Sequence, residues 1–144
     1  MNKQEIKILI VDDEPDIREF VSYNLFRRGY TVITAADGKE GYDLALEFKP
    51  NLIILDVLMP VMNGYETCIR LRKNPIFDQT KIIFLSALNE STAKDLGLEL
   101  EADAFIGKPI RIELLVKRIE LWLKTSIPVP VISPNYKPAQ GLGN

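Results

Sequence analysis

The sequence predicts a doubly wound α/β fold, built on a five-stranded parallel sheet with the strand order 2-1-3-4-5. Five short apolar runs alternate along the chain with segments whose apolar residues recur at helical spacing, a pattern typical of α/β domains. The first run is continuous rather than alternating, as expected of a strand buried on both faces. Right-handed crossovers leave few strand orders, of which 2-1-3-4-5 is a common one.

The first strand is expected at residues 7–11, a run of β-branched residues and leucine. A helix then begins at Glu14-Pro15, because proline is accepted in the first turn, and ends near Gly29. Four of its apolar residues recur at helical spacing and are expected to face the sheet: Ile17, Phe20, Val21 and Leu25.

The second strand is expected at residues 31–35 and the second helix at residues 38–48. Leu44 and Phe48 would face inward from that helix, and Pro50 would stop it.

The third strand is expected at residues 51–55, followed by a loop that ends at Asn63. The third helix covers residues 64–72, and a turn at Asn74-Pro75 leads into the fourth strand, residues 81–85.

The fourth helix is expected to begin at Asn89 or Ser91 and to end near Leu100. Gly97 within it costs about 1 kcal/mol relative to alanine, so this helix should be among the least stable. The fifth strand is expected at residues 103–106.

The last helix, residues 110–124, is apolar on more than one face. Four residues can face the sheet: Ile112, Leu115, Ile119 and Leu123. Leu114 and Leu121 form a second stripe. Either residues 127–132 fold back over this stripe, or it is a surface for a partner.

We expect one domain over residues 1–124, followed by a proline-rich tail or linker over residues 125–144. The tail holds four of the nine prolines and no acidic residue, which predicts an extended chain. It is too short to be an effector domain. Whether the chain acts alone or begins a longer protein is left open.

Composition excludes several classes of function. The 144 residues carry a net charge of −2, which gives no general attraction to nucleic acid or to anionic membranes. No apolar run reaches the roughly 20 residues of a membrane span, and the polar N-terminus lacks a signal peptide, so we predict a cytoplasmic protein. Histidine is absent and Cys68 is the lone cysteine, so a bound metal would be held by oxygen, which favours Mg²⁺, Ca²⁺ or Mn²⁺.

Complementary polar side chains stand where four of the predicted strands end: Asp12, Asp13, Asp56, Ser86 and Lys108. Parallel strands bring these ends to one edge of the sheet, where open α/β sheets bind ligands. The three carboxylates would repel one another, and burial would raise their pKa values. Together with Lys108, one Mg²⁺ would bring the formal charge of the group to zero. A carboxylate beside these two cations is suited to attack a phosphoryl group.

These residues resemble the receiver domain of bacterial response regulators in two-component signalling, a CheY-like domain with a flavodoxin-like topology. The resemblance covers roughly residues 5–124. It rests on several motifs at matching spacing: Asp12-Asp13, Asp56, Met59-Pro60, Gly64, Ser86-Ala87 and Lys108-Pro109.

The resemblance implies that Asp56 is the phosphoacceptor and that a histidine kinase or histidine phosphotransfer protein supplies the phosphoryl group. The Mg²⁺ ligands would be Asp12, Asp13, Asp56 and the carbonyl of Leu58. Ser86 and Lys108 would hold the phosphoryl group.

Phe105 occupies the switch position of the family. With Ser86 it would remodel the surface formed by helix 4, strand 5 and helix 5, which a downstream protein or effector domain would read. The Lys108–Pro109 bond is expected to be cis. Such a domain is a phosphoacceptor switch that assists its own phosphorylation and dephosphorylation, and we do not expect an enzyme.

The sequence departs from the family pattern in places. Glu101 replaces a glycine that commonly precedes the fifth strand. Receivers that feed winged-helix DNA-binding domains often pair through charges on their last elements. Asp103 and Arg118 match that pattern, but Leu114 and Glu120 replace the other expected partners. We therefore disfavour that particular dimer and leave a homodimer open.

Two leucines are expected at the mouth of the site, because Leu58 and Leu88 each lie two residues beyond a site residue. Neither can orient a water by hydrogen bonding, and both can exclude it. We predict a long-lived aspartyl phosphate.

Three other interpretations of the polar strand ends are possible. A phosphatase with an aspartyl nucleophile, of the haloacid dehalogenase type, would need a second aspartate where Leu58 stands. A flavin-binding fold would need a loop rich in hydroxyls and glycine after the first strand, where Asp13-Glu14-Pro15 would repel phosphate. An interaction module that is not phosphorylated is disfavoured by the complete set of polar strand ends.

Overall fold

The computed structural model describes residues 3–87 and 102–124. The fourth helix expected between Asn89 and Leu100 lies outside these ranges, as do Leu88, Glu101 and the tail from residue 125.

The five strands form one parallel sheet in the order β2-β1-β3-β4-β5, which confirms the predicted order. Their bounds are β1 Lys7–Val11, β2 Thr31–Ala35, β3 Leu52–Asp56, β4 Lys81–Ser86 and β5 Ala104–Gly107. The bounds predicted for β1 and β2 are confirmed, and those predicted for β3, β4 and β5 differ by one residue. The polar residues Asp56 and Ser86 belong to β3 and β4 because they continue the ladder.

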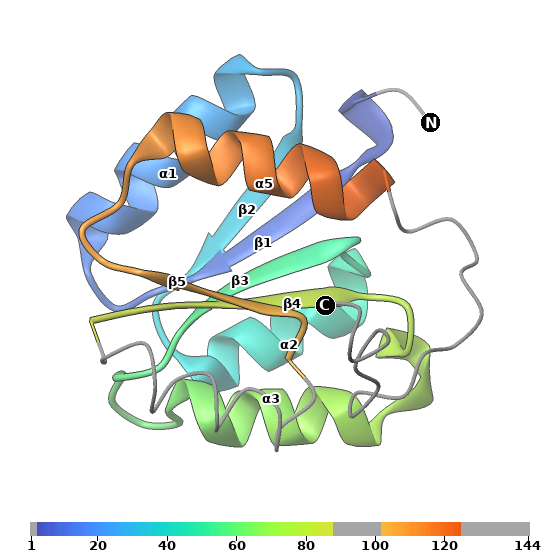
Figure 1. Ribbon diagram of the computed structural model, residues 1–144. Helices are drawn as coiled ribbons and strands as arrows, with labels where there is room; N and C mark the ends of the chain where they lie inside the picture. The colour runs from blue at the N-terminus through green and yellow to red at the C-terminus, as the bar shows by residue number, and fades with distance from the viewer. Residues whose placement is uncertain (1–2, 88–101, 125–144) are drawn as a thin grey trace, which may run out of the picture.

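Two layers of helix cover the sheet. Their bounds are α1 Pro15–Arg27, α2 Gly38–Phe48, α3 Gly64–Lys73 and α5 Ile112–Lys124, with 3-10 turns at Lys3–Glu5 and Pro75–Phe77. Figure 1 shows α1 and α5 on one face of the sheet and α2 and α3 on the other. None of the described helices combines the length and apolar character of a membrane-spanning segment.

Each face of the sheet has its own apolar core. Alternate residues of β1 show the division, since Ile8 and Ile10 pack towards α1 and α5 while Leu9 and Val11 pack in the other layer. Leu44 and Phe48 pack on the second core as predicted. Because β1, β3 and β4 are buried on both sides, they form a rigid platform for the residues at their ends.

Side-chain hydrogen bonds to the backbone fix the first residues of α2 and α3. The Asp37 side chain accepts a hydrogen bond from the Glu40 amide at the start of α2, and Asn63 and Glu66 form a reciprocal capping box at the start of α3. Glu14 is the N-cap of α1, and its side chain makes no capping hydrogen bond.

The predicted inward position of Phe20 is wrong, because its side chain is 45% exposed. Val21 and Leu25 are fully buried and lie one above the other on α1, since they are four residues apart. Phe20 is turned about 100° from Val21 around the helix axis, so it lies beside the buried stripe.

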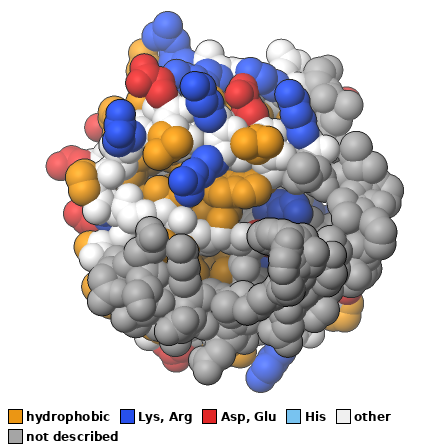
Figure 2. All heavy atoms as spheres, in the orientation of Figure 1, with side chains coloured by type: hydrophobic (Ala, Val, Ile, Leu, Met, Phe, Trp, Pro, Cys, Tyr) orange, Lys and Arg blue, Asp and Glu red, His pale blue; other side chains and the backbone are white. Residues whose placement is uncertain are grey.

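Both predicted stripes of α5 are confirmed. Leu115 and Ile119 are buried and face the sheet, and Ile112 and Leu123 pack against the same core. The second stripe is exposed: Leu114 by 41% and Leu121 by 61%. Figure 2 shows lysine and arginine side chains interspersed with apolar ones on the face of the molecule that carries α5.

The loop between β3 and α3 folds tightly onto the end of β3. The Gly64 amide donates to the Val57 carbonyl at 2.9 Å. A Cβ atom at Gly64 would overlap the carbonyl oxygen of Asp56 and lie 2.8 Å from the Cα of Val57. Glycine at this position therefore lets α3 begin directly behind Asp56.

We expect Gly64→Ala to lower the free energy of unfolding by about 1–3 kcal/mol, because the new methyl must displace backbone. Gly107→Ala is the matched control, since the nearest described atom beyond its chain neighbours, the Ser86 carbonyl oxygen, would lie 4.0 Å from its Cβ. Urea unfolding of both variants measures the difference. Equal stability of the two variants would contradict the tight approach.

Candidate functional site

The ends of four strands place the site. Asp12 follows β1, Asp56 ends β3, Ser86 ends β4 and Lys108 follows β5. Val11 pairs in register with Leu55, and the neighbouring pairs continue to Ser86 beside Gly107. All four polar residues therefore lie at the same edge of the sheet, as the sequence predicts.

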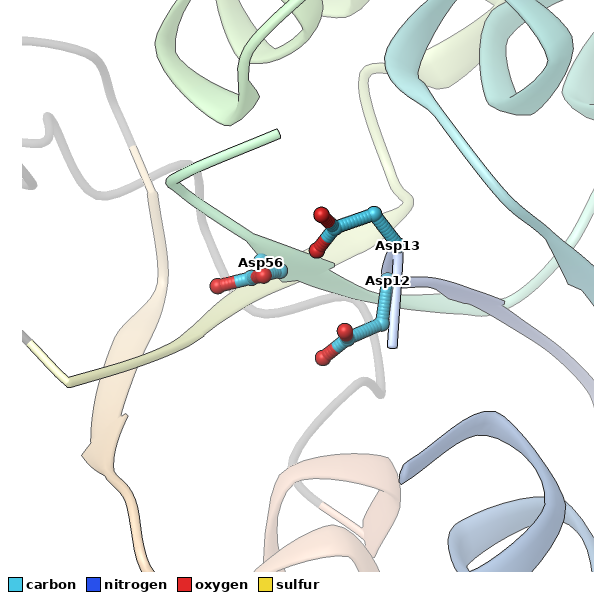
Figure 3. A group of neighbouring side chains, drawn as sticks. All are labelled: Asp12, Asp13 and Asp56. Carbon is cyan, nitrogen blue, oxygen red and sulfur yellow. The ribbon is translucent and has the colours of Figure 1, made fainter. Parts of the chain in front are cut away.

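Three carboxylates meet at this edge. Asp12, Asp13 and Asp56 each offer an oxygen, and these oxygens lie within 4.8 Å of one another. Figure 3 shows the three carboxylate groups extending from the ends of β1 and β3 into the same space. Asp12 is 1% exposed and Asp56 is 4% exposed, whereas Asp13 is exposed. Two of the three charges are thus taken almost completely out of water.

Lys108 reaches into the group of carboxylates from β5. Its backbone amide donates to the Ser86 carbonyl at 2.8 Å, which fixes the start of the side chain beside β4. Its Nζ lies 3.1 Å from Asp12 Oδ2 and 3.5 Å from Asp56 Oδ2. The predicted cis bond between Lys108 and Pro109 is confirmed.

A fourth carboxylate, which no sequence pattern indicated, belongs to the group. Glu14 Oε1 lies 2.6 Å from Lys108 Nζ, closer than either aspartate. Only the fold could reveal this contact, because 94 residues separate the two side chains. The four carboxylates and one ammonium leave three negative charges without a partner within the group.

The electrostatics follow from burial. Burial, together with the charge of Asp12, raises the pKa of Asp56 to about 6, although Lys108 acts in the opposite direction. Burial also raises the pKa of Asp12, against the hydrogen bond from the Glu14 amide. Burial alone disfavours the ammonium of Lys108, but the nearby carboxylates of Glu14 and Asp12 outweigh it and raise the pKa of Lys108.

The residues present fit a hard divalent cation. Asp12 Oδ1 accepts the Glu14 amide at 2.8 Å. Asp12 Oδ2 is buried and has no hydrogen bond in the described part of the chain, only its 3.1 Å ion pair with Lys108. A buried oxygen with spare accepting capacity, beside two more carboxylates and excess negative charge, is what Mg²⁺ binds. The acidic group can therefore hold a metal ion.

The remaining predicted site residues lie around this group. Ser86 is fully buried at the end of β4. Phe105 is half-buried, pairs in register with Phe84 and packs on the α2 and α3 side of the sheet. Leu58 lies in the loop after β3 with its side chain 60% exposed. The roles assigned to these three residues, including the Leu58 carbonyl as a metal ligand, stay predictions.

The sequence matches the response regulator receiver domain family over residues 8–120. The chain belongs to this family. Among curated relatives, the receiver domain is 43% identical to the alkaline phosphatase synthesis transcriptional regulatory protein PhoP of Bacillus subtilis, over 84% of this chain and 51% of that protein. It is 36% identical to the transcriptional regulator RpaA of Synechocystis, over 86% of this chain and 52% of that protein. The chain thus spans about half the length of the curated relatives it matches.

Solved structures agree with this assignment. The chemotaxis protein CheY4 of Vibrio cholerae is 36% identical and superposes with a TM-score of 0.77, over 81% of this receiver domain and 97% of that chain. The beryllofluoride-activated receiver domain of RstA from Klebsiella pneumoniae is 27% identical with a TM-score of 0.76, over 82% and 98% of the two chains. The CheY-like fold expected from the sequence is confirmed.

The raised pKa of Asp56 predicts a pH-dependent stability difference. Its pKa is about 6 in the folded state against an ordinary 3.8, so the ionised carboxylate opposes folding above pH 6. We expect metal-free Asp56→Asn to be about 1–3 kcal/mol more stable than the wild type at pH 7.5. This advantage should shrink as the pH falls through 6 and vanish below 3.8.

Urea unfolding of both proteins across this pH range measures the difference, with Asp78→Asn as an exposed control. Saturating Mg²⁺ at pH 7.5 should stabilise the wild type more than Asp56→Asn, because bound cation offsets the charge. A stability difference that is constant from pH 7.5 to pH 4 would contradict the account.

Proposed function

We propose that Asp56 accepts a phosphoryl group from a phosphohistidine of a histidine kinase or a histidine phosphotransfer protein. One observation carries the proposal: a buried carboxylate stands at the sheet edge with two acidic neighbours and an ammonium 3.5 Å away. With a pKa of about 6, most of the Asp56 side chain is the ionised nucleophile at neutral pH.

In the proposed step, a carboxylate oxygen of Asp56 attacks phosphorus. An O–P bond forms as the N–P bond of the phosphohistidine breaks, and the leaving imidazole nitrogen keeps the electron pair of that bond. The Lys108 ammonium would stabilise the negative charge on the oxygens of the phosphoryl group during transfer. The Ser86 hydroxyl would donate a hydrogen bond to one of these oxygens.

Mg²⁺ is the proposed cofactor, held by Asp12, Asp13, Asp56 and the Leu58 carbonyl. It would neutralise part of the charge that accumulates between the carboxylates and the incoming phosphoryl oxygens. Oxygen donors and excess negative charge support this choice. The carboxylates of Asp12 and Asp13 would hold the ion beside Asp56, where it can contact the oxygens of the incoming phosphoryl group.

The phosphorylated state would be read through β5 and α5 together with the segment between residues 88 and 101. New charge on Asp56 would draw in Ser86 and bias Phe105 towards a more buried position, which shifts the population between two states. Phe105 suits this role because it lies half-buried on the edge strand β5. A downstream protein or an effector domain would bind the changed surface.

The proposed organisation is a receiver over residues 1–124 and a tail or linker over residues 125–144. The relatives are transcriptional regulators about twice as long, which supports an effector domain in the same protein as one form of output. We also retain three predictions from the sequence. The protein is cytoplasmic, these residues contact neither nucleic acid nor membrane, and the domain acts as a switch and not as an enzyme.

A homodimer also stays a prediction. Asp103, which the sequence analysis considered for pairing between protomers, is engaged within this chain. Its Oδ2 accepts hydrogen bonds from Arg72 at 2.9 Å and from the Ile82 amide at 2.8 Å. This pairing supports the view that the particular charge-paired dimer weighed above is disfavoured.

We expect the wild type to gain the mass of one phosphoryl group on incubation with acetyl phosphate and Mg²⁺. Intact mass spectrometry should show no gain without Mg²⁺ or in Asp56→Ala, whereas Asp78→Asn, an exposed control, should behave as the wild type. An unmodified wild type that also fails to bind Mg²⁺ would favour an interaction module that is not phosphorylated.

The lifetime of the aspartyl phosphate tests whether Leu58 limits the access of water to the site. Leu58→Asn should speed hydrolysis by about two- to tenfold, the range one hydrogen bond to the attacking water can contribute. Leu114→Asn, an exposed leucine on α5, is the control. An unchanged hydrolysis rate in Leu58→Asn would mean that this leucine does not limit the access of water.

A further inference from the structure

Lys108 is held most closely by a residue outside the proposed metal and acceptor set. Its Nζ lies 2.6 Å from Glu14 Oε1, 3.1 Å from Asp12 Oδ2 and 3.5 Å from Asp56 Oδ2. The contact to Asp56, where the phosphoryl group would form, is thus the longest of the three. Something other than Asp56 therefore sets the resting position of the ammonium.

The backbone of Glu14 is fixed in the turn between β1 and α1. Its amide donates to Asp12 Oδ1 at 2.8 Å, and its carbonyl accepts the amides of Ile17 and Arg18 at 3.1 Å. Arg18 Nη1 in turn donates to the Asp12 carbonyl at 2.7 Å. The Glu14 side chain thus leaves a well-anchored N-cap position and reaches Lys108 from a constant starting point.

The Glu14 carboxylate is not hydrogen-bonded to the first turn of the helix that begins after this residue. It makes no capping hydrogen bond, although N-cap side chains commonly accept one from the first turn. It is 56% exposed, so it could remain in water, whereas the Lys108 side chain is 13% exposed. The carboxylate is directed instead at an ammonium that two buried aspartates also contact.

We infer that Glu14 is a positioning residue, which holds Lys108 back from Asp56 until a phosphoryl group competes for the ammonium. A phosphoryl group carries up to about two negative charges and can outcompete a single, largely hydrated carboxylate. Lys108 then needs only to turn from one anion to another at the same edge. Glu14 thereby sets how readily the phosphorylated state forms. This inference rests on the proposed function of Asp56.

Two variants separate this role from a general effect of negative charge. Glu14→Gln removes the charge and keeps the size of the side chain. Glu14→Asp keeps the charge, but its shorter carboxylate is suited to capping α1 and is withdrawn from Lys108. Glu19→Gln removes a charge from an exposed position on the same helix and serves as control.

The first measurement uses metal-free protein and needs no phosphorylation. The ammonium of Lys108 is largely buried, so its side-chain ¹⁵N resonance can be followed. We expect this resonance to shift in both Glu14→Gln and Glu14→Asp and to stay in place in Glu19→Gln. An unshifted resonance in Glu14→Gln would overturn the contact on which the inference rests.

The second measurement is the affinity for beryllofluoride, a phosphoryl mimic, at saturating Mg²⁺. Both Glu14→Gln and Glu14→Asp should bind it about two- to fivefold more tightly than the wild type, the range expected of a partly exposed ion pair. Wild-type affinity in Glu14→Asp with tighter binding in Glu14→Gln would show a general charge effect and overturn the inference. So would wild-type affinity in both variants.

The failure of the proposed function is distinguishable from these outcomes. In that case the wild type itself binds no beryllofluoride and gains no phosphoryl group. If the wild type binds the mimic and the Glu14 variants match it, only the role of Glu14 is wrong.

Discussion

The burial of negative charge at one edge of the sheet is the constraint on which the rest of this structure depends. Asp12 and Asp56 stand almost fully buried beside Asp13, and a carboxylate removed from water is stable only when it is paired or neutralised. Lys108 supplies part of that compensation and is itself kept in place by the carbonyl of Ser86. The remaining negative charge suits the site to a divalent cation.

The fold separates a fixed part of the site from an adjustable part. Asp12 and Asp13 directly follow β1 and Asp56 ends β3, and both are central strands packed between two apolar cores. Phe105 belongs to the edge strand β5, where only Ile106 is buried, and Lys108 directly follows that strand. Under the proposed function, a new charge at Asp56 would face acids anchored by buried central strands on one side and a less buried edge strand on the other. This asymmetry gives a local event a way to reach the surface.

Most of this arrangement was predictable, because strand polarity alone brings the residues after β1, β3, β4 and β5 together. The strand order and the meeting of Asp12, Asp13 and Asp56 with Lys108 followed from it. The strand ends were misplaced by a residue at Asp56 and Ser86, because a polar residue can still continue a ladder.

Side-chain reach was not predictable in the same way. The inward position of Phe20 was wrong because the buried stripe of α1 runs through Val21 and Leu25, and Phe20 lies beside that stripe. Glu14 was missed because no local pattern joins the start of α1 to the end of β5. Its presence also changes the charge balance: with Glu14 in the group, Mg²⁺ leaves one negative charge instead of none.

The decisive experiment is a titration of the metal-free protein with Mg²⁺, followed through backbone amide resonances. We predict one saturable site whose largest shifts lie at residues 12–14, 56–58 and 108. The exposed acids Glu40, Asp43 and Glu47 on α2 provide an internal comparison. No saturable shift at the sheet edge, or stronger binding at these α2 acids, would contradict this prediction.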